Sequence, residues 1–165
     1  MDIDFNALAS IIGIFSVVSA IAALLLESRR SRITLQSNLL LKLDEKFYSP
    51  EILKLRQAAA TKLLNEKYLN YELDKLLDAY TTVAMLIECK AIDMDLAYRI
   101  FEYDIVRYWL SAEKHIKENR CIDSELWLTL ERTVKKLMAE RRKRGQPHPT
   151  KEELVRFLKE EACCE

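Results

Sequence analysis

Four residues of the segment 94–118 have the types and spacing of an anion-binding surface. Arg99, Tyr103, Arg107 and Lys114 fall on one face of a predicted helix. An arginine presents a planar fork of donors to a phosphate, and a tyrosine ring offers a stacking surface to a base. The same pattern also fits a solvated face, because an aspartate stands three or four residues before each of the two arginines and predicts a local ion pair.

A second basic region lies at the end of the next predicted helix. Seven cations occur in thirteen residues, and they include Arg132, Lys136 and the run 141–144. Cations at the carboxyl end of a helix complement its dipole, which explains part of this cluster. The excess predicts contact with anionic lipid headgroups, a nucleotide ligand or RNA. Arg132 and Lys136 therefore join the candidate ligand-binding residues.

Catalytic and metal chemistry have few candidates in this sequence. His115 and His148 are the only histidines, and neither has a predictable partner for nucleophilic catalysis or the ligand spacing of a zinc site. Asp74 and Asp78 are four residues apart, a spacing that is common among solvated carboxylates on a helix face. With two glycines in the chain, no glycine-rich phosphate loop can be written. We predict no catalytic residue, no metal and no cofactor, and expect the protein not to be an enzyme.

The elements that must position these residues are all predicted to be helices. Apolar residues recur at three- and four-residue intervals through most of the chain, and no segment alternates as a strand does. Polar residues that favour helix N-caps stand before the apolar runs, and a glycine follows one of them. The first expected helix runs from Pro50, capped by Ser49, to about Asn65, and a second one follows the cap Asn70. A third runs from Met94, capped by Asp93, to about Glu118, and a fourth from Asp123 or Ser124 to the run 141–144 before Gly145. The last expected helix follows the capping box 150–153.

The N-terminal region predicts a membrane anchor. Residues 5–26 carry no charge, and 22 residues of helix extend over about 33 Å, enough to cross a hydrocarbon core of about 30 Å. A secretory signal peptide is the alternative, but its leader is positively charged, whereas this leader carries Asp2 and Asp4. Arg29, Arg30 and Arg32 follow the span, so the positive-inside rule places the N-terminus outside and the remainder in the cytoplasm of a bacterial cell, at its inner membrane.

Small residues form a stripe along this predicted anchor. They alternate at spacings of four and three, a heptad pattern that lets helix backbones approach each other closely in lipid. A homo-oligomer, dimer or tetramer, is expected from this seam, although small residues are frequent in membrane helices by chance. The seam consists of Ala9, Gly13, Ser16, Ala20 and Ala23.

The chain is therefore expected to be all-α, with one transmembrane helix that continues into a cytoplasmic helical bundle. Its domains are residues 1–27, the anchor; 28–48, a helical stalk; and 49–162, the cytoplasmic domain. In a reducing cytoplasm the four cysteines are not expected to form disulfides, and the vicinal pair Cys163 and Cys164 is best explained as an exposed tail. The net charge of zero argues against DNA as a partner.

Three short segments carry a resemblance to a known family. The stretch 43–51 (LDEKFYSPE), the tripeptide 72–74 (ELD) and the stretch 105–109 (IVRYW) are similar to a bacterial family of small, membrane-anchored helical proteins of unknown function. The resemblance covers about residues 40–130 and implies the architecture without an activity. The layout, without a shared motif, also resembles the membrane effectors of bacterial antiviral signalling, whose cytosolic domain binds a cyclic nucleotide.

Together these features lead to a functional hypothesis. The cytoplasmic domain senses an anionic ligand, with a cyclic oligonucleotide as the leading class, and acts on the membrane lipid through its oligomerised anchors. The alternative is a membrane scaffold without enzymatic activity that binds a protein partner. A basic pocket would favour the first hypothesis, and an exposed apolar groove the second.

Overall fold

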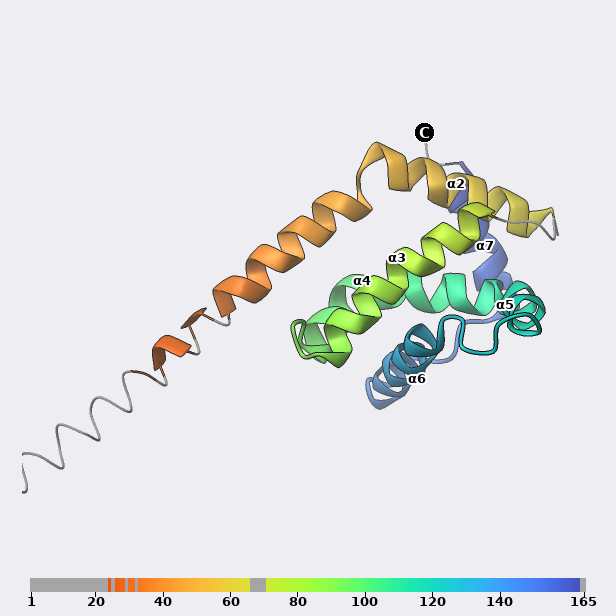
Figure 1. Cartoon of the computed structure of the whole chain (residues 1–165). Helices are drawn as coiled ribbons and strands as arrows, with labels where there is room; N and C mark the ends of the chain where they lie inside the picture. Colours follow the sequence, from red (N-terminus) through yellow and green to blue (C-terminus); the bar gives the residue numbers. More distant parts are fainter. Residues whose placement is uncertain (1–23, 25, 29, 32, 66–70, 164–165) are drawn as a thin grey trace, which may run out of the picture. The chain divides into compact units, whose positions relative to one another are not determined.

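The computed structural model describes residues 24, 26–28, 30, 31, 33–65 and 71–163 of the 165-residue chain. Within these ranges every regular element is a helix, and none of the described residues is in a strand (Figure 1). The prediction of an all-α fold is therefore confirmed. The chain divides into two compact units, residues 1–43 and residues 44–165.

The first unit contains the segment predicted to be the membrane anchor. Of residues 5–26, only Leu24 and Leu26 are among the described residues, and both are exposed. The proposed seam of small residues, from Ala9 to Ala23, lies outside them altogether. In the part of the chain that is described, no helix combines the length and apolar character that a membrane crossing requires. Residues 33–43 are helical, as predicted for the stalk.

The second unit begins before the predicted boundary at residue 49, because Phe47 belongs to its core. The Phe47 ring stacks on Tyr80 with centroids 5.4 Å apart, and it contacts Phe101 at 5.7 Å. Aromatic pairs at these separations contribute beyond the area they bury. The last turns of the predicted stalk are thus part of the helical domain.

The first two helices of this unit follow the predicted pattern. Helix α2 spans Pro50–Leu64, with the Ser49 side chain accepting a hydrogen bond from the Ile52 amide and proline at the first position. Helix α3 spans Tyr71–Glu88. Its predicted cap, Asn70, lies outside the described residues. The buried residues of α3 recur every three or four positions, as the sequence indicates: Leu73, Leu76, Leu77, Tyr80, Val83, Ala84 and Ile87.

The helix predicted from Met94 to about Glu118 is two helices, so this prediction is wrong in its second half. Helix α4 spans Met94–Ser111 and begins at the predicted cap, Asp93, whereas α5 spans Glu113–Arg120. The two meet at Ala112, which is fully buried and leaves helical geometry with φ −90° and ψ 3°. The break redirects α5 so that His115 reaches Asp74 of α3, at 2.6 Å. Periodicity within the segment gives no sign of this distant contact.

The next helix begins later than the sequence predicts. Helix α6 spans Leu128–Lys143, and the segment before it forms turns rather than the expected first helical turn. Trp127 adopts a left-handed backbone, φ 57°, while its buried indole donates to the Asp78 carboxylate at 2.8 Å. The helix starts directly after this anchored residue. The predicted end is confirmed, because Gly145 at φ 71° closes a Schellman motif through its amide and that of Gln146.

Helix α7 spans Lys151–Ala162 and opens with the predicted capping box between Thr150 and Glu153. Phe157 and Leu158 are its buried apolar residues. In the helical domain α2 packs against α3 and α7, while α6 packs against α3 and α4 (Figure 1). Helix α4 also contacts α3 and α7, so its packing decides which of its candidate side chains stay accessible.

Candidate functional site

The candidate ligand-binding residues are spread over three helices. Arg99, Tyr103 and Arg107 lie on α4, Lys114 lies on α5, and Arg132 and Lys136 lie on α6. The prediction that Lys114 shares a helix face with Arg107 is wrong, because the chain turns at Ala112 between them. The structure brings Tyr103 and Arg107 into contact.

Two of the candidate arginines are engaged in ion pairs. The predicted pair within α4 is present, with Arg99 Nε 2.9 Å from Asp95 Oδ2. Arg132 Nε lies 2.9 Å from Glu88 Oε1 at the end of α3, and this hydrogen bond lowers the pKa of Glu88. In both pairs the carboxylate occupies guanidinium donors that a phosphate would otherwise bind. Lys136 is exposed on α6 and contributes electrostatically to the same shift at Glu88.

The basic run at the end of α6 holds the following turn in place. Arg141 Nη1 lies 2.7 Å from Glu102 Oε1 in a mostly buried pair, and Arg141 Nε donates to the Pro147 carbonyl at 2.6 Å. Arg144 stacks over the Tyr98 ring with 4.2 Å to its centroid, and it pairs with both Asp95 and Glu140. Structural contacts to α4 and to its own helix thus account for much of the cationic excess in the sequence.

Arg107 differs from the other arginines of α4 and α6. The residue is only 7% exposed, yet among the described residues its guanidinium makes a single hydrogen bond, from Nη1 to the Tyr103 carbonyl at 3.1 Å. The expected pair with Asp104 is absent from the described part of the chain, because Asp104 Oδ2 instead lies 3.0 Å from Arg56 Nη2. Among the described residues, no carboxylate neutralises Arg107 within 4 Å. A buried cation in this state is costly unless a counter-ion completes it.

The Tyr103 ring supports the Arg107 guanidinium. Arg107 Cζ lies 3.6 Å from the ring centroid, a cation–π contact on one ring face. Phe157 of α7 meets the same ring edge-on, with centroids 5.7 Å apart, and Tyr103 as a whole is 50% exposed. Nε and Nη2 of Arg107 have no hydrogen-bond partner among the described residues, and neither atom is completely buried. We call Tyr103 and Arg107 the Arg107 site.

A buried polar network lies where α2, α4 and α7 converge. Arg56 of α2 makes two 2.7 Å hydrogen bonds to Glu161 of α7, from Nε and from Nη2, in a two-pronged pair. The same Nη2 contacts Asp104 of α4 at 3.0 Å. The Tyr108 hydroxyl lies 2.8 Å from Glu161 Oε2 and 3.2 Å from the Arg56 carbonyl oxygen. We call Arg56, Asp104, Tyr108 and Glu161 the Arg56 network.

Burial controls the ionisation of this network. The pKa of Asp104 is raised, because burial disfavours the carboxylate more than Arg56 and Arg107 favour it. Burial and the negative charge of Glu161 also raise the pKa of Tyr108, which keeps its hydroxyl protonated as a donor. Burial alone would lower the pKa of Arg56, but the hydrogen bond to Glu161 and the nearby negative charges raise it. The network thus holds one permanent cation between two carboxyl groups.

The contacts of His115 could not be inferred from the sequence. His115 Nε2 lies 2.6 Å from Asp74 Oδ1 and 3.1 Å from Asn119 Nδ2, and the imidazole stacks on Trp127 with centroids 6.2 Å apart. Asp74 is 41 residues away in the chain, so no local motif could have predicted this pair. No group of three potential metal ligands is close enough to hold an ion within the described ranges.

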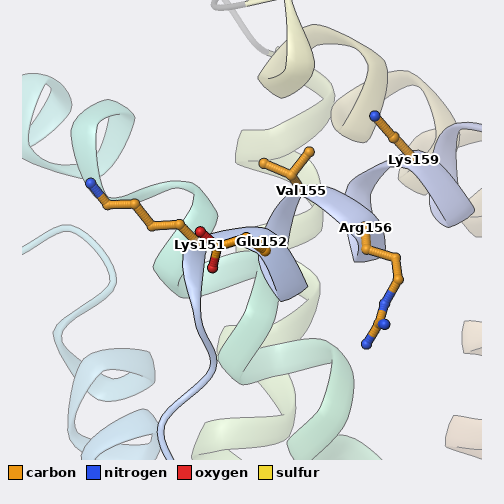
Figure 2. Close-up of a pocket in the computed structure, with 5 residues that line it drawn as sticks. All are labelled: Lys151, Glu152, Val155, Arg156 and Lys159. Carbon is orange, nitrogen blue, oxygen red and sulfur yellow. The ribbon is translucent and has the colours of Figure 1, made fainter.

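The outer face of α7 carries a shallow hollow (Figure 2). Its lining comes from one helix alone, and it consists of Lys151, Glu152, Val155, Arg156 and Lys159. No opposing element supplies a second wall, and the polar groups point along the helix surface rather than toward a common centre. The hollow therefore lacks the convergent polar groups of a ligand site.

Comparison with known proteins identifies no relative of this chain: no family model matches the sequence, and no curated protein or solved structure matches it either.

Proposed function

We propose that this protein is a membrane-anchored receptor without enzymatic activity, whose helical domain binds an anionic, phosphate-bearing ligand at the Arg107 site. The single observation that supports it most is the Arg107 guanidinium, which is buried, stacked on Tyr103 and without a carboxylate partner among the described residues. Its Nε and Nη2 atoms, which have no partner among the described residues, have the spacing that two phosphate oxygens require.

The exposed Tyr103 ring extends the proposed ligand class from phosphate to nucleotide. Arg107 covers one face of this ring, and a base can stack only on the other. A cyclic oligonucleotide, which combines phosphates with bases, satisfies both residues. In bacterial antiviral defence such a messenger would act through the domain on the membrane, by way of oligomerised anchors.

The apolar segment 5–26 supports the membrane part of the proposal. Its length suffices to cross a bilayer, and the arginines that follow favour retention of the helical domain in the cytoplasm. Helix association through Gly13 and the other small residues would bring several helical domains together.

Topology gives the first prediction. A reporter enzyme that is active only in the periplasm, fused after Glu165, is expected to be silent in bacterial cells, and the chain is expected in the membrane fraction. Replacing Arg29, Arg30 and Arg32 together with glutamate should increase the periplasmic signal, because the positive-inside bias is lost. A parent fusion that is active in the periplasm would contradict the proposed orientation.

Ligand binding gives the second prediction. In full-length protein in detergent micelles, titrated with cyclic di- and trinucleotides and with pyrophosphate, Arg107→Ala should weaken binding about 10- to 100-fold. Arg107→Lys should recover part of this loss, because lysine keeps the charge without the fork. Tyr103→Phe should bind like the parent and Tyr103→Ala should not, because stacking needs the ring alone.

Arg99→Ala is the matched control, since Arg99 lies on the same helix but is paired with Asp95. Equal binding by Arg107→Ala and the parent protein, with both folded by circular dichroism, would contradict the proposed site. The second candidate function, a membrane scaffold for a protein partner, would then lead. One observation favours it: Ile100 and Tyr103, three residues apart on α4, are both exposed.

A further inference from the structure

Helix α7 connects the Arg56 network with the Arg107 site. Its Glu161 carboxylate holds the Arg56 guanidinium by two hydrogen bonds of 2.7 Å. One turn earlier, its Phe157 ring contacts Tyr103 at 5.7 Å and Tyr108 at 5.0 Å. A displacement of α7 would therefore change the surroundings of both arginines at once.

The Arg56–Glu161 contact has the form of a bound ligand. Two oxygens of one carboxylate meet Nε and Nη2 of one guanidinium, and an arginine binds a phosphate group by the same two-pronged geometry. The Tyr108 hydroxyl adds a third polar contact to Glu161, at 2.8 Å. An external phosphate would find the same donors if the Glu161 carboxylate left.

We propose that α7 is an autoinhibitory latch in which Glu161 occupies Arg56 as an internal substitute for the anionic ligand. Release of α7 adds Arg56 to Arg107 as a second phosphate-binding residue and frees the Tyr103 ring from Phe157. The inference rests on the proposed function, which supplies the ligand, and it adds a way in which binding of that ligand is regulated.

Helix α7 packs along α2 and on α4, but it buries few residues of its own. Phe157 and Leu158 are its two buried residues, whereas α3 buries seven. Helices with few buried apolar contacts open locally at a lower free energy than core helices. The segment 142–148 before α7 is exposed but is held by Arg141 at the Pro147 carbonyl and by Tyr98 at the Gln146 side chain, so α7 opens from its C-terminal half, where Glu161 lies. The buried Phe157 ring and the ion pair to Arg56 are then the two restraints on opening, and the ion pair is the one that a change of charge at Glu161 removes.

Electrostatics also links the two arginines. The Asp104 carboxyl interacts with Arg56 directly and with Arg107 at longer range. Both cations therefore lie around one carboxyl group on the face of α4 toward α2 and α7. Loss of Glu161 leaves Asp104 as the one carboxylate of the network, and two guanidinium groups exceed what a single carboxylate can neutralise.

The test compares Glu161→Gln with Glu160→Gln in the full-length protein in detergent micelles. Glutamine keeps the shape of the side chain and removes its charge, and Glu160, which is exposed and lies 4.0 Å from Arg156 of the same helix, is the neighbouring control for loss of a surface charge. Hydrogen–deuterium exchange of the α7 amides should be about tenfold faster in Glu161→Gln, with α3 unchanged, and Glu160→Gln should behave like the parent. Pyrophosphate affinity should rise several-fold in Glu161→Gln alone.

Each contrary result has a distinct meaning. Exchange in α7 at the parent rate, or an equal rise in α2, α3 and α7, would overturn the latch. Faster α7 exchange with an unchanged, measurable pyrophosphate affinity would overturn the role of Glu161 as a substitute for the ligand. Faster α7 exchange in a protein that binds no phosphate-bearing compound would overturn the proposed function while leaving the mobility of α7 established.

Discussion

Replacing Arg56 with alanine is expected to lower the free energy of unfolding of the helical domain by about 3–5 kcal/mol, because it leaves buried carboxylates without their cation. Glu161 would lose both 2.7 Å hydrogen bonds, and Asp104 would lose its partner at 3.0 Å. The two carboxyl groups would then repel each other in a site of low polarity. Protonation would relieve part of this cost, since the pKa of Asp104 is already raised by burial.

Urea denaturation followed by tryptophan fluorescence measures this effect in the full-length protein. The only tryptophans, Trp109 and Trp127, lie in residues 44–165, so the signal reports on the helical domain alone. Arg56→Lys should fall between the parent and Arg56→Ala, because it keeps the charge but not the fork. Arg99→Ala, which breaks an exposed pair, should leave the midpoint nearly unchanged. A similar result for Arg56→Ala would refute a stabilising role for the network.

Phe157→Ala is expected to cost about 3–5 kcal/mol, because it removes a fully buried ring that no neighbour can replace. Phe157 is 2% exposed and lies between Tyr103 and Tyr108, with its ring edge-on to both. The same fluorescence assay measures the loss. Val155→Ala on the same helix is the control, since its side chain faces solvent and its removal should cost less than about 0.5 kcal/mol.

A smaller loss of unfolding free energy for Phe157→Ala would contradict the expected contribution of α7 to stability. If the free energy of unfolding falls by less than about 1 kcal/mol, α7 contributes little to global stability and its contacts with α4 are not restraining. Phe157→Leu should retain most of the stability, because leucine fills much of the volume and keeps an apolar contact with both tyrosines.

Much of the fold could be predicted because local signals decide it. The Ser49 cap, the Asp93 cap, the Thr150 capping box and the Gly145 stop all lie within a few residues of the backbone groups they satisfy. The apolar spacing of α3 likewise identifies its buried residues. Such features depend on sequence neighbours alone and can be inferred from one chain.

The two errors in helix boundaries have a common physical cause. Ala112 interrupts the predicted helix, and the next one begins only after Trp127; beside both places a side chain is hydrogen-bonded to an aspartate of α3. Contacts with Asp74 and Asp78 are 41 and 49 residues away in sequence. Local propensity cannot anticipate partners at such separations.

Only part of the candidate site could be predicted from the sequence, because one of its pairings again depends on residues far apart in the chain. The sequence identified Arg107 and Tyr103 but paired Arg107 with Asp104, its neighbour one turn away. In the structure Asp104 is taken by Arg56, which is 48 positions earlier in the sequence. The competition between a near and a distant partner decides which arginine stays without a carboxylate, and only the tertiary structure reveals it.

The separation of Arg56 and Glu161 has a consequence for how this protein is made. The two residues are 105 positions apart, and ribosomes add about 5–20 residues each second, so Arg56 waits roughly 5–20 s for its partner to be synthesised. During this interval Asp104 of α4 is the one carboxylate of the Arg56 network that can pair with Arg56. A nascent chain of this protein therefore carries an incompletely neutralised cation beside the translating ribosome until α7 emerges.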